Sequence, residues 1–224
     1  MTRLGAFWAS SVGKKTVMAV TGLIGVVFVI AHMIGNLQAF QGAQRINAYG
    51  LILHGPLNEL LWVVRIVLLT SVVLHVLAAY QLTIRDRAAR PVGYARREPQ
   101  VSTLAARTMR WGGVLLLIFI VFHILHFTTG TIRPAGTVLE GDVYANIVGS
   151  FRVPWVAAFY IVSMIALGLH LYHGAWSSFR SLGAAPASPH PLQRRLTLAV
   201  ALIVSIGFAL IPVAVLAGVL SGGH

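Results

Sequence analysis

The sequence contains no cysteine and little acid, with 5 Asp and Glu residues among 224, against 17 Lys and Arg. The absence of cysteine excludes disulfides, thiolate catalysis, zinc–thiolate sites and any iron–sulfur cluster held by this chain. Any metal ion must therefore be bound mainly by histidine, of which there are 9. Charged residues make up only 10% of the chain, whereas hydrophobic residues make up 57%. A water-soluble domain of this size cannot bury so much apolar surface, so we expect the chain to lie mainly in lipid.

The net charge of +12 would suggest a nucleic-acid partner in a soluble protein. Here the basic residues gather between apolar runs, a pattern that is typical of membrane topology. We therefore expect lipid, and no nucleic acid, around this chain.

Five apolar runs are long enough to cross a membrane, because a bilayer core of about 30 Å takes about 20 residues of helix. They lie at about 16–38, 60–84, 107–129, 154–178 and 195–220. The first run follows Lys14 and Lys15 as in a signal peptide, but no cleavage motif follows, so we expect a mature helix. The segments 39–59 and 130–153 are predicted connectors, with a short apolar stretch at Val143–Val148 expected along the membrane interface. The sequence predicts an all-α integral membrane protein, a single domain over 1–224, with five transmembrane helices in a bundle.

The Lys and Arg residues are concentrated on one side of the predicted bundle. The opposite side has only Arg45, Arg133 and Arg152. The side of the N-terminus holds thirteen: Arg3, Lys14, Lys15, Arg85, Arg87, Arg90, Arg96, Arg97, Arg107, Arg110, Arg180, Arg194 and Arg195. Since positively charged short loops stay in the cytoplasm, we expect a cytoplasmic N-terminus, an outside C-terminus and a multi-pass protein of the inner (cytoplasmic) cell membrane.

Four of the histidines inside the predicted spans, His32, His75, His123 and His170, each lie on a different one of the first four spans. Each follows the start of its span by about 22 to 24 Å of helical rise. Because successive spans run in opposite directions, His32 and His123 fall near the outer surface, whereas His75 and His170 fall near the inner surface. The vertical distance between the two pairs is about 15 Å by the same rise.

Two histidine pairs at two depths match the needs of two haems, since a six-coordinate haem iron takes one imidazole from each side of its ring. An intramembrane histidine can alternatively do no more than hydrogen-bond a neighbouring helix. His126 and His173 each follow a proposed ligand by three residues and nearly share its helix face. Spacing alone therefore does not separate His123 from His126, or His170 from His173.

Six stretches of the sequence, in order and spread over nearly the whole chain, resemble one known family. They are Ser11–Leu23 (SVGKKTVMAVTGL), Ala31–Leu37 (AHMIGNL), Ile46–Tyr49 (INAY), Val73–Leu82 (VLHVLAAYQL), Phe122–Leu125 (FHIL) and Leu169–Ser177 (LHLYHGAWS). The family is the dihaem cytochrome b membrane anchor of bacterial succinate:quinone oxidoreductases, the respiratory complex II that joins the tricarboxylic acid cycle to electron transport.

The resemblance implies that the four histidines are the axial ligands of two b haems, paired as His32 with His123 and His75 with His170. It leaves His126 and His173 as neighbours of the haems or as unused residues. It also implies that electrons pass between an iron–sulfur subunit, docked on the cytoplasmic side with a flavoprotein that carries FAD and the succinate site, and a membrane quinone, commonly menaquinone. This chain would then be the membrane subunit of a succinate dehydrogenase, with quinone chemistry at this subunit as an additional expectation.

A charged residue, Arg65, stands inside the second span, about 15 Å from His75 toward the outer side. Because the spans hold no acidic partner for it, we expect Arg65 to pair with the propionates of the outer haem, or else to extend to the outer headgroups. Some members of the family have an acidic residue near this point, so a quinone-site role is not transferred to it.

Quinone reduction takes two protons, so its site needs a protonatable group near a haem. The candidates are His54 and Glu59 on the outer side and Tyr80 on the inner side, each of which can equally be an ordinary surface residue. Two other functions stay open. One is a dihaem anchor of a hydrogenase or formate dehydrogenase, and the other is a haem-free proton-conducting membrane protein whose histidines relay protons.

Overall fold

The long helices of this chain form one membrane bundle, seen here in a computed structural model that describes residues 2–89, 104–136, 140–184 and 191–221. The long helices are α2 (Ser11–Leu37), α4 (Asn58–Ala88), α5 (Leu104–His123), α7 (Pro154–Ser181) and α8 (Pro191–Leu216). A π-helical turn, η2 (Ile124–Thr128), continues α5. Five helices in the described ranges are long and apolar enough to cross a membrane, and those ranges contain no strand. The predicted all-α, multi-pass membrane protein is confirmed.

Most of the spanning helices extend beyond the apolar runs that predicted them, because backbone hydrogen bonds continue into the charged residues at a membrane surface. In α4, for example, Arg85 and Arg87 form the last turn. The fifth spanning helix, α8, begins and ends four residues earlier in the sequence than predicted. It begins at Pro191, since a proline at a helix start has no N–H to lose, and it ends at Leu216, just before Gly218 with its positive φ of 76°.

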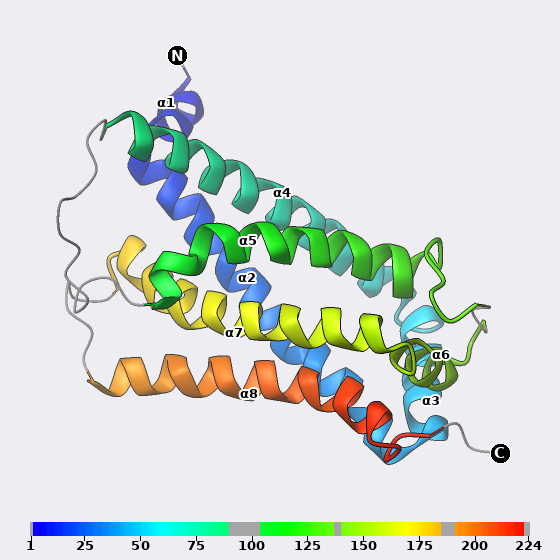
Figure 1. Cartoon of the computed structure of the whole chain (residues 1–224). Coiled ribbons are helices and arrows are strands. Elements are labelled where there is room, and N and C mark those ends of the chain that lie inside the picture. The colour runs from blue at the N-terminus through cyan, green and yellow to red at the C-terminus, as the bar shows by residue number, and fades with distance from the viewer. Residues whose placement is uncertain (1, 90–103, 137–139, 185–190, 222–224) are drawn as a thin grey trace.

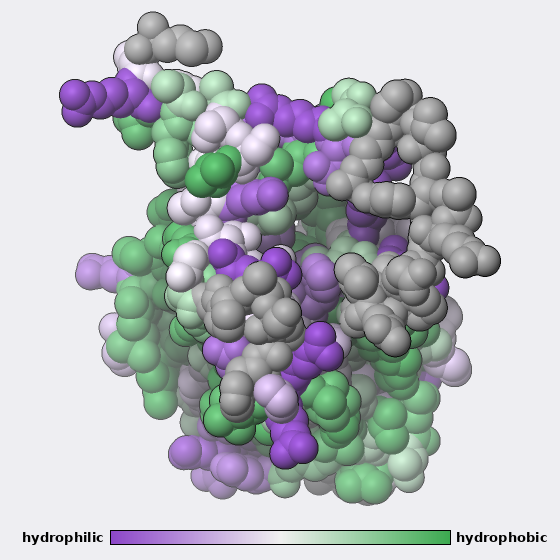
Figure 2. All heavy atoms as spheres, turned by 90° about the vertical axis from the view of Figure 1, so that its left-hand side faces the viewer, coloured by the Kyte–Doolittle hydropathy of each residue, from purple (hydrophilic) through white to green (hydrophobic). Residues whose placement is uncertain are grey.

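The bundle of spanning helices has two distinct ends (Figure 1). The N-terminal end carries the short helix α1 (Arg3–Ala9), the ends of α4 and α7, and the starts of α5 and α8. Figure 2 faces this end and shows hydrophilic side chains gathered across it, with hydrophobic side chains over much of the flanks. Three of the cations assigned to this side, Arg90, Arg96 and Arg97, lie outside the described residues.

The opposite end is closed by short helices in segments that the sequence predicted to be connectors. These are the 3-10 turn η1 (Gln38–Gln41), α3 (Ala43–His54) and α6 (Val143–Phe151). Four residues of α6, including Val148 and Phe151, are buried against α7 and α8, and the expected place of this stretch along the membrane interface stays a prediction. The Asn47 side chain donates to Asp142 (2.9 Å) and ties α3 to the start of α6.

Helix α7 is central, because it packs against α2, α5 and α8, while α2 also packs against α4. Small residues permit the close approaches, as is common between membrane helices. A side chain at Gly207 of α8 would collide with Met33 of α2, and one at Gly168 of α7 would collide with Ser205 of α8. By contrast, α4 packs extensively against α2 but makes at most sparse contact with α5 and α7 within the described residues. At the N-terminal end, Arg110 of α5 pairs with Asp86 of α4 at 3.7 Å.

Candidate functional site

The four histidines of the first four spans meet as two pairs inside the bundle. The rings of His32 (α2) and His123 (the last residue of α5) have their centres 5.8 Å apart, at an interplanar angle of 81°. The rings of His75 (α4) and His170 (α7) have their centres 6.2 Å apart, at 55°. Two imidazoles that share one metal ion at a metal–nitrogen distance of about 2 Å hold their ring centres about 6 Å apart. Both separations therefore suit a shared ion between the rings.

The two pairs lie at different levels of the bundle, and two helices give the same spacing. His75 contacts α2 at Thr21, which precedes His32 by eleven residues, or about 16 Å of helical rise. His123 contacts α7 at Tyr160, which precedes His170 by ten residues, or about 15 Å. The His75–His170 pair lies toward the N-terminal end, and the His32–His123 pair lies toward the opposite end.

A main-chain hydrogen bond orients the ring of His75. Its Nδ1 lies 3.0 Å from the carbonyl oxygen of Met18 and 3.2 Å from the hydroxyl of Thr21. That hydroxyl itself donates to the carbonyl of Val17 at 2.7 Å. Because a carbonyl only accepts, Nδ1 must carry the proton and donate to Met18, which leaves Nε2 with a free lone pair. The ring is thus prepared to bind a metal ion through Nε2.

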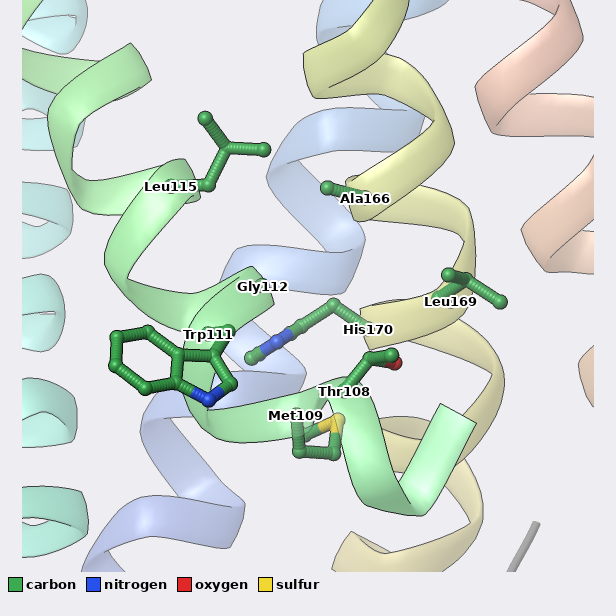
Figure 3. A pocket seen from close by; sticks show the side chains of 8 residues that line it. All are labelled: Thr108, Met109, Trp111, Gly112, Leu115, Ala166, Leu169 and His170. Carbon is green, nitrogen blue, oxygen red and sulfur yellow. The ribbon is translucent and has the colours of Figure 1, made fainter. Parts of the chain in front are cut away.

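The ring of His170 extends from α7 toward Gly112 of α5 and borders a cavity of about 220 Å³ between these helices (Figure 3). Its Nδ1 is buried and has no hydrogen-bond partner among the described residues. A buried nitrogen without a hydrogen-bond partner costs free energy. Among the buried side-chain polar atoms that the structure describes, this nitrogen is the one that lacks such a partner.

Glycines leave open space beside the inner pair and along α2 between the two levels. A Cβ atom built at Gly25 of α2 or at Gly112 of α5 would meet nothing within 4 Å. At Gly113 a Cβ would lie 3.9 Å from the ring of His170. The inward face of α4, which includes Val72, is also left without extensive packing from α5 or α7. Protein interiors are normally close-packed, so this arrangement fits a large flat group between the helices.

The structure separates the histidines that spacing could not separate. Both nitrogens of His126 are engaged, Nδ1 with the hydroxyl of Tyr160 at 3.1 Å and Nε2 with that of Ser150 at 2.9 Å. Because both of its nitrogens are engaged, His126 is less suited to bind a metal ion than His123, whose contact with Tyr160 is made through Nδ1 and not through Nε2. His173 is partly buried one turn beyond His170, and its ring belongs to neither pair.

Arg65 lies partly buried on the same side of α4 as Val72 and His75. Its guanidinium carbon stands 5.0 Å from the ring centre of Trp62, a cation–π contact with its own helix. Within the described residues Arg65 forms no salt bridge. The predicted pairing with a haem propionate remains a prediction.

The three quinone candidates do not come together. His54 is exposed at the end of α3, where its Nδ1 donates to the carbonyl of Gly50 at 2.9 Å. Glu59 is exposed in the first turn of α4, and Tyr80 is 64% exposed further along the same helix. All three remain predictions.

Two site residues were not selected from the sequence, Tyr160 and Ser150. A signal for Tyr160 was present, because it precedes His170 on the same helix by the rise that separates the two levels, and this puts it at the depth of His123. Ser150 had no such signal, because α6 was not predicted to enter the core.

The donor set of this site consists of two pairs of imidazoles. Among the described residues no group of three or more His, Asp or Glu is arranged to hold a metal ion. A pair of histidines is, however, one donor set that holds a haem iron in proteins, and the ring separations, the free Nε2 of His75 and the open glycine faces fit that group. No protein-family model, no curated protein and no solved structure matches the chain.

Proposed function

We propose that this chain is a dihaem cytochrome b membrane anchor that passes electrons between a docked enzyme and a membrane quinone. The observation that carries the proposal is the presence of two histidine pairs, with ring centres 5.8 and 6.2 Å apart, at two levels of one membrane bundle. Single intramembrane histidines often serve as helix contacts, but two matched pairs from four helices are the arrangement that two stacked haems require.

In this proposal the chain's own residues bind the two haems, orient the histidine rings and exclude water. His32 with His123, and His75 with His170, would hold one haem iron each through their ring nitrogens. A haem held by these residues would supply reversible one-electron chemistry. The carbonyl of Met18 fixes the orientation of His75, and apolar side chains of the spans exclude water. In this proposal Arg65 neutralises a haem propionate at the opposite end of the bundle.

We assign the chain to a succinate:quinone oxidoreductase, respiratory complex II, on the strength of its sequence resemblance. In that assembly the basic N-terminal end faces the cytoplasm of the cell and docks the iron–sulfur subunit, to which the flavoprotein with its FAD is bound. The quinone, menaquinone or another, exchanges electrons at this subunit in the inner membrane.

Haem content tests the cytochrome proposal. We expect the protein purified in mild detergent to contain about two b haems per chain, with the reduced spectrum of bis-histidine ligation. His75→Ala should lose the inner haem and keep the outer one, which halves the haem content. His54→Ala, a histidine removed from an exposed position on α3, should retain both haems. A colourless wild-type protein that is otherwise folded would overturn the proposal and favour a haem-free proton path.

The partner subunits test the assignment to complex II. We expect a tagged chain, isolated from its native membrane, to bring with it a flavin-containing subunit and an iron–sulfur subunit that together reduce quinone with succinate. Two haems in a chain that instead brings a hydrogenase or a formate dehydrogenase would preserve the cytochrome proposal and refute the assignment to succinate.

A further inference from the structure

A buried chain of four polar side chains runs behind the outer histidine pair. The Nδ1 of His123 lies 3.3 Å from the hydroxyl of Tyr160, which in turn lies 3.1 Å from the Nδ1 of His126. The Nε2 of His126 lies 2.9 Å from the hydroxyl of Ser150 on α6. His126 is only 3% exposed, and Tyr160 and Ser150 are each 6% exposed. The chain thus joins α5 with η2, α7 and α6 away from water.

With the hydroxyl of Tyr160 donating to one of the two histidines, the hydrogen atoms of this chain permit two directions, because a neutral imidazole carries one N–H and a hydroxyl donates once. In one direction His123 donates to Tyr160, Tyr160 donates to His126, and His126 donates to Ser150. In the reverse direction Tyr160 donates to His123, which puts the proton of His123 on Nε2. Only the first direction leaves the Nε2 of His123 free to bind a metal ion.

The backbone favours this placement of both histidines. The helix changes to π geometry directly after His123, with the amide of Thr129 bonded to the carbonyl of Ile124 at 2.9 Å. A π-turn is wider than an α-turn, and such turns are frequent at functional sites. Here it accompanies a geometry in which His123 and His126 both reach the single hydroxyl of Tyr160.

We propose that Tyr160, held in turn by His126 and Ser150, is a positioning residue that accepts the Nδ1–H of His123 and thereby directs its Nε2 toward His32. This inference rests on the proposed function, because it concerns how an outer haem ligand is oriented. The two levels of the bundle then differ in kind. At the inner level the orienting acceptor for His75 is a main-chain carbonyl, whereas at the outer level it is a side chain.

The alternative reading is that Tyr160 only fills space among aromatic rings. Its ring centre lies 5.0 Å from those of Phe119 and Phe151, a separation typical of aromatic packing. The substitution Tyr160→Phe separates the two readings, because it preserves the ring and removes only the hydroxyl. It leaves the Nδ1 of His123 and the Nδ1 of His126 without that partner.

The test measures the reduction potential and the low-temperature electron paramagnetic resonance (EPR) signal of each haem in the purified full-length protein. His32→Ala first identifies which potential belongs to the outer haem, because it removes an outer ligand only. A hydrogen bond from Nδ1–H makes the imidazole a stronger electron donor to the iron. In Tyr160→Phe we therefore expect two bound haems, a more positive outer potential, a changed outer EPR signal and an unchanged inner potential.

Two further variants keep the proposal falsifiable if Tyr160→Phe folds poorly. Ser150→Ala removes the last acceptor of the chain and should shift the outer potential in the same direction by a smaller amount. Ser163→Ala is the matched control. It removes a fully buried hydroxyl from the same helix, one that within the described residues donates to the carbonyl of Phe159 at 2.7 Å, and it should leave both potentials unchanged.

The outcomes are separable from those of the proposed function. Wild-type protein without haem refutes the proposed function before any variant is compared. Two haems whose outer potential and EPR signal are the same in wild type, Tyr160→Phe and Ser150→Ala overturn the positioning role alone. Selective loss of the outer haem in Tyr160→Phe, with both haems retained in Ser163→Ala, supports that role.

Discussion

The hydrogen bonds of single rings distinguish His75 from His126. His75 donates from Nδ1 to a carbonyl and keeps Nε2 free, whereas His126 has both nitrogens bound to hydroxyls. Two histidines inside one membrane bundle, one at each level, thus differ in their capacity to bind a metal ion. The difference comes from residues on other helices and not from the histidines themselves.

Gly112 gives a test of the space beside the inner pair. We expect Gly112→Leu to expel the inner haem and halve the haem content, because its side chain would fill the cavity of about 220 Å³ next to His170. The pyridine haemochrome spectrum of the purified protein measures this content. Val114 lies on the same helix and is 52% exposed, so Val114→Leu should keep both haems. If that cavity is not a haem site, Gly112→Leu should leave the haem content unchanged and raise the unfolding temperature by filling it.

The residue-level predictions from sequence succeeded where rise along a helix was sufficient and ended where three-dimensional contacts decide. Counting residues along each span anticipated which histidine rings meet, although their role as haem ligands stays a prediction. It did not separate His123 from His126, because residues three apart share a helix face. The separation depends on Tyr160 and Ser150, which reach η2 from distant parts of the chain.

At the scale of the helices, the length of the apolar runs was sufficient to predict five spans. The prediction follows from membrane thickness and needs no tertiary information. The short helices α3 and α6 were missed, because a helix of about three turns takes most of its stability from packing that a local pattern does not contain. Four residues of α6, among them Ile147 and Val148, are buried against segments that lie far away in the sequence.

The packing of α8 against α2 depends on one glycine. We expect Gly207→Leu to destabilise the bundle by about 1–3 kcal/mol, because its side chain would collide with Met33. Unfolding in mixed detergent micelles, followed by helical circular dichroism, measures the loss.

Two variants control this measurement. Ile206→Leu changes the adjacent residue, which is 54% exposed, and should shift stability by less than about 0.5 kcal/mol. Adding Met33→Ala to Gly207→Leu should restore part of the loss. Equal stability of Gly207→Leu and the wild type would contradict a close contact between α8 and α2.

For the whole molecule, the asymmetry of charge is the strongest guide to topology. Basic residues of the N-terminal end outnumber those of the opposite end, so the positive-inside rule predicts a cytoplasmic N-terminus and an outside C-terminus. The packing of the helices is the same for either orientation in the membrane, so the orientation stays a prediction from sequence.

The natural absence of cysteine makes this topology directly measurable. Ala184→Cys introduces a thiol at the N-terminal end, and Ala135→Cys introduces one at the opposite end, both at exposed positions. We expect a membrane-impermeant maleimide to label Ala135→Cys in intact cells (spheroplasts, where an outer membrane is present) and Ala184→Cys only after lysis. The wild-type chain provides an unlabelled background in both conditions. Labelling of Ala184→Cys in the intact preparation would reverse the assigned orientation.

The sparse packing of α4 has a consequence for how such a protein is assembled. Among the described residues α4 packs extensively on α2, whereas its inward face makes at most sparse contact with α5 and α7. If two haems fill that space, they hold α4 to α5 and α7 in addition to carrying electrons. In a cell short of iron, this chain would then be inserted with α4 only loosely attached, and α4 would be the first segment that quality-control proteases cleave.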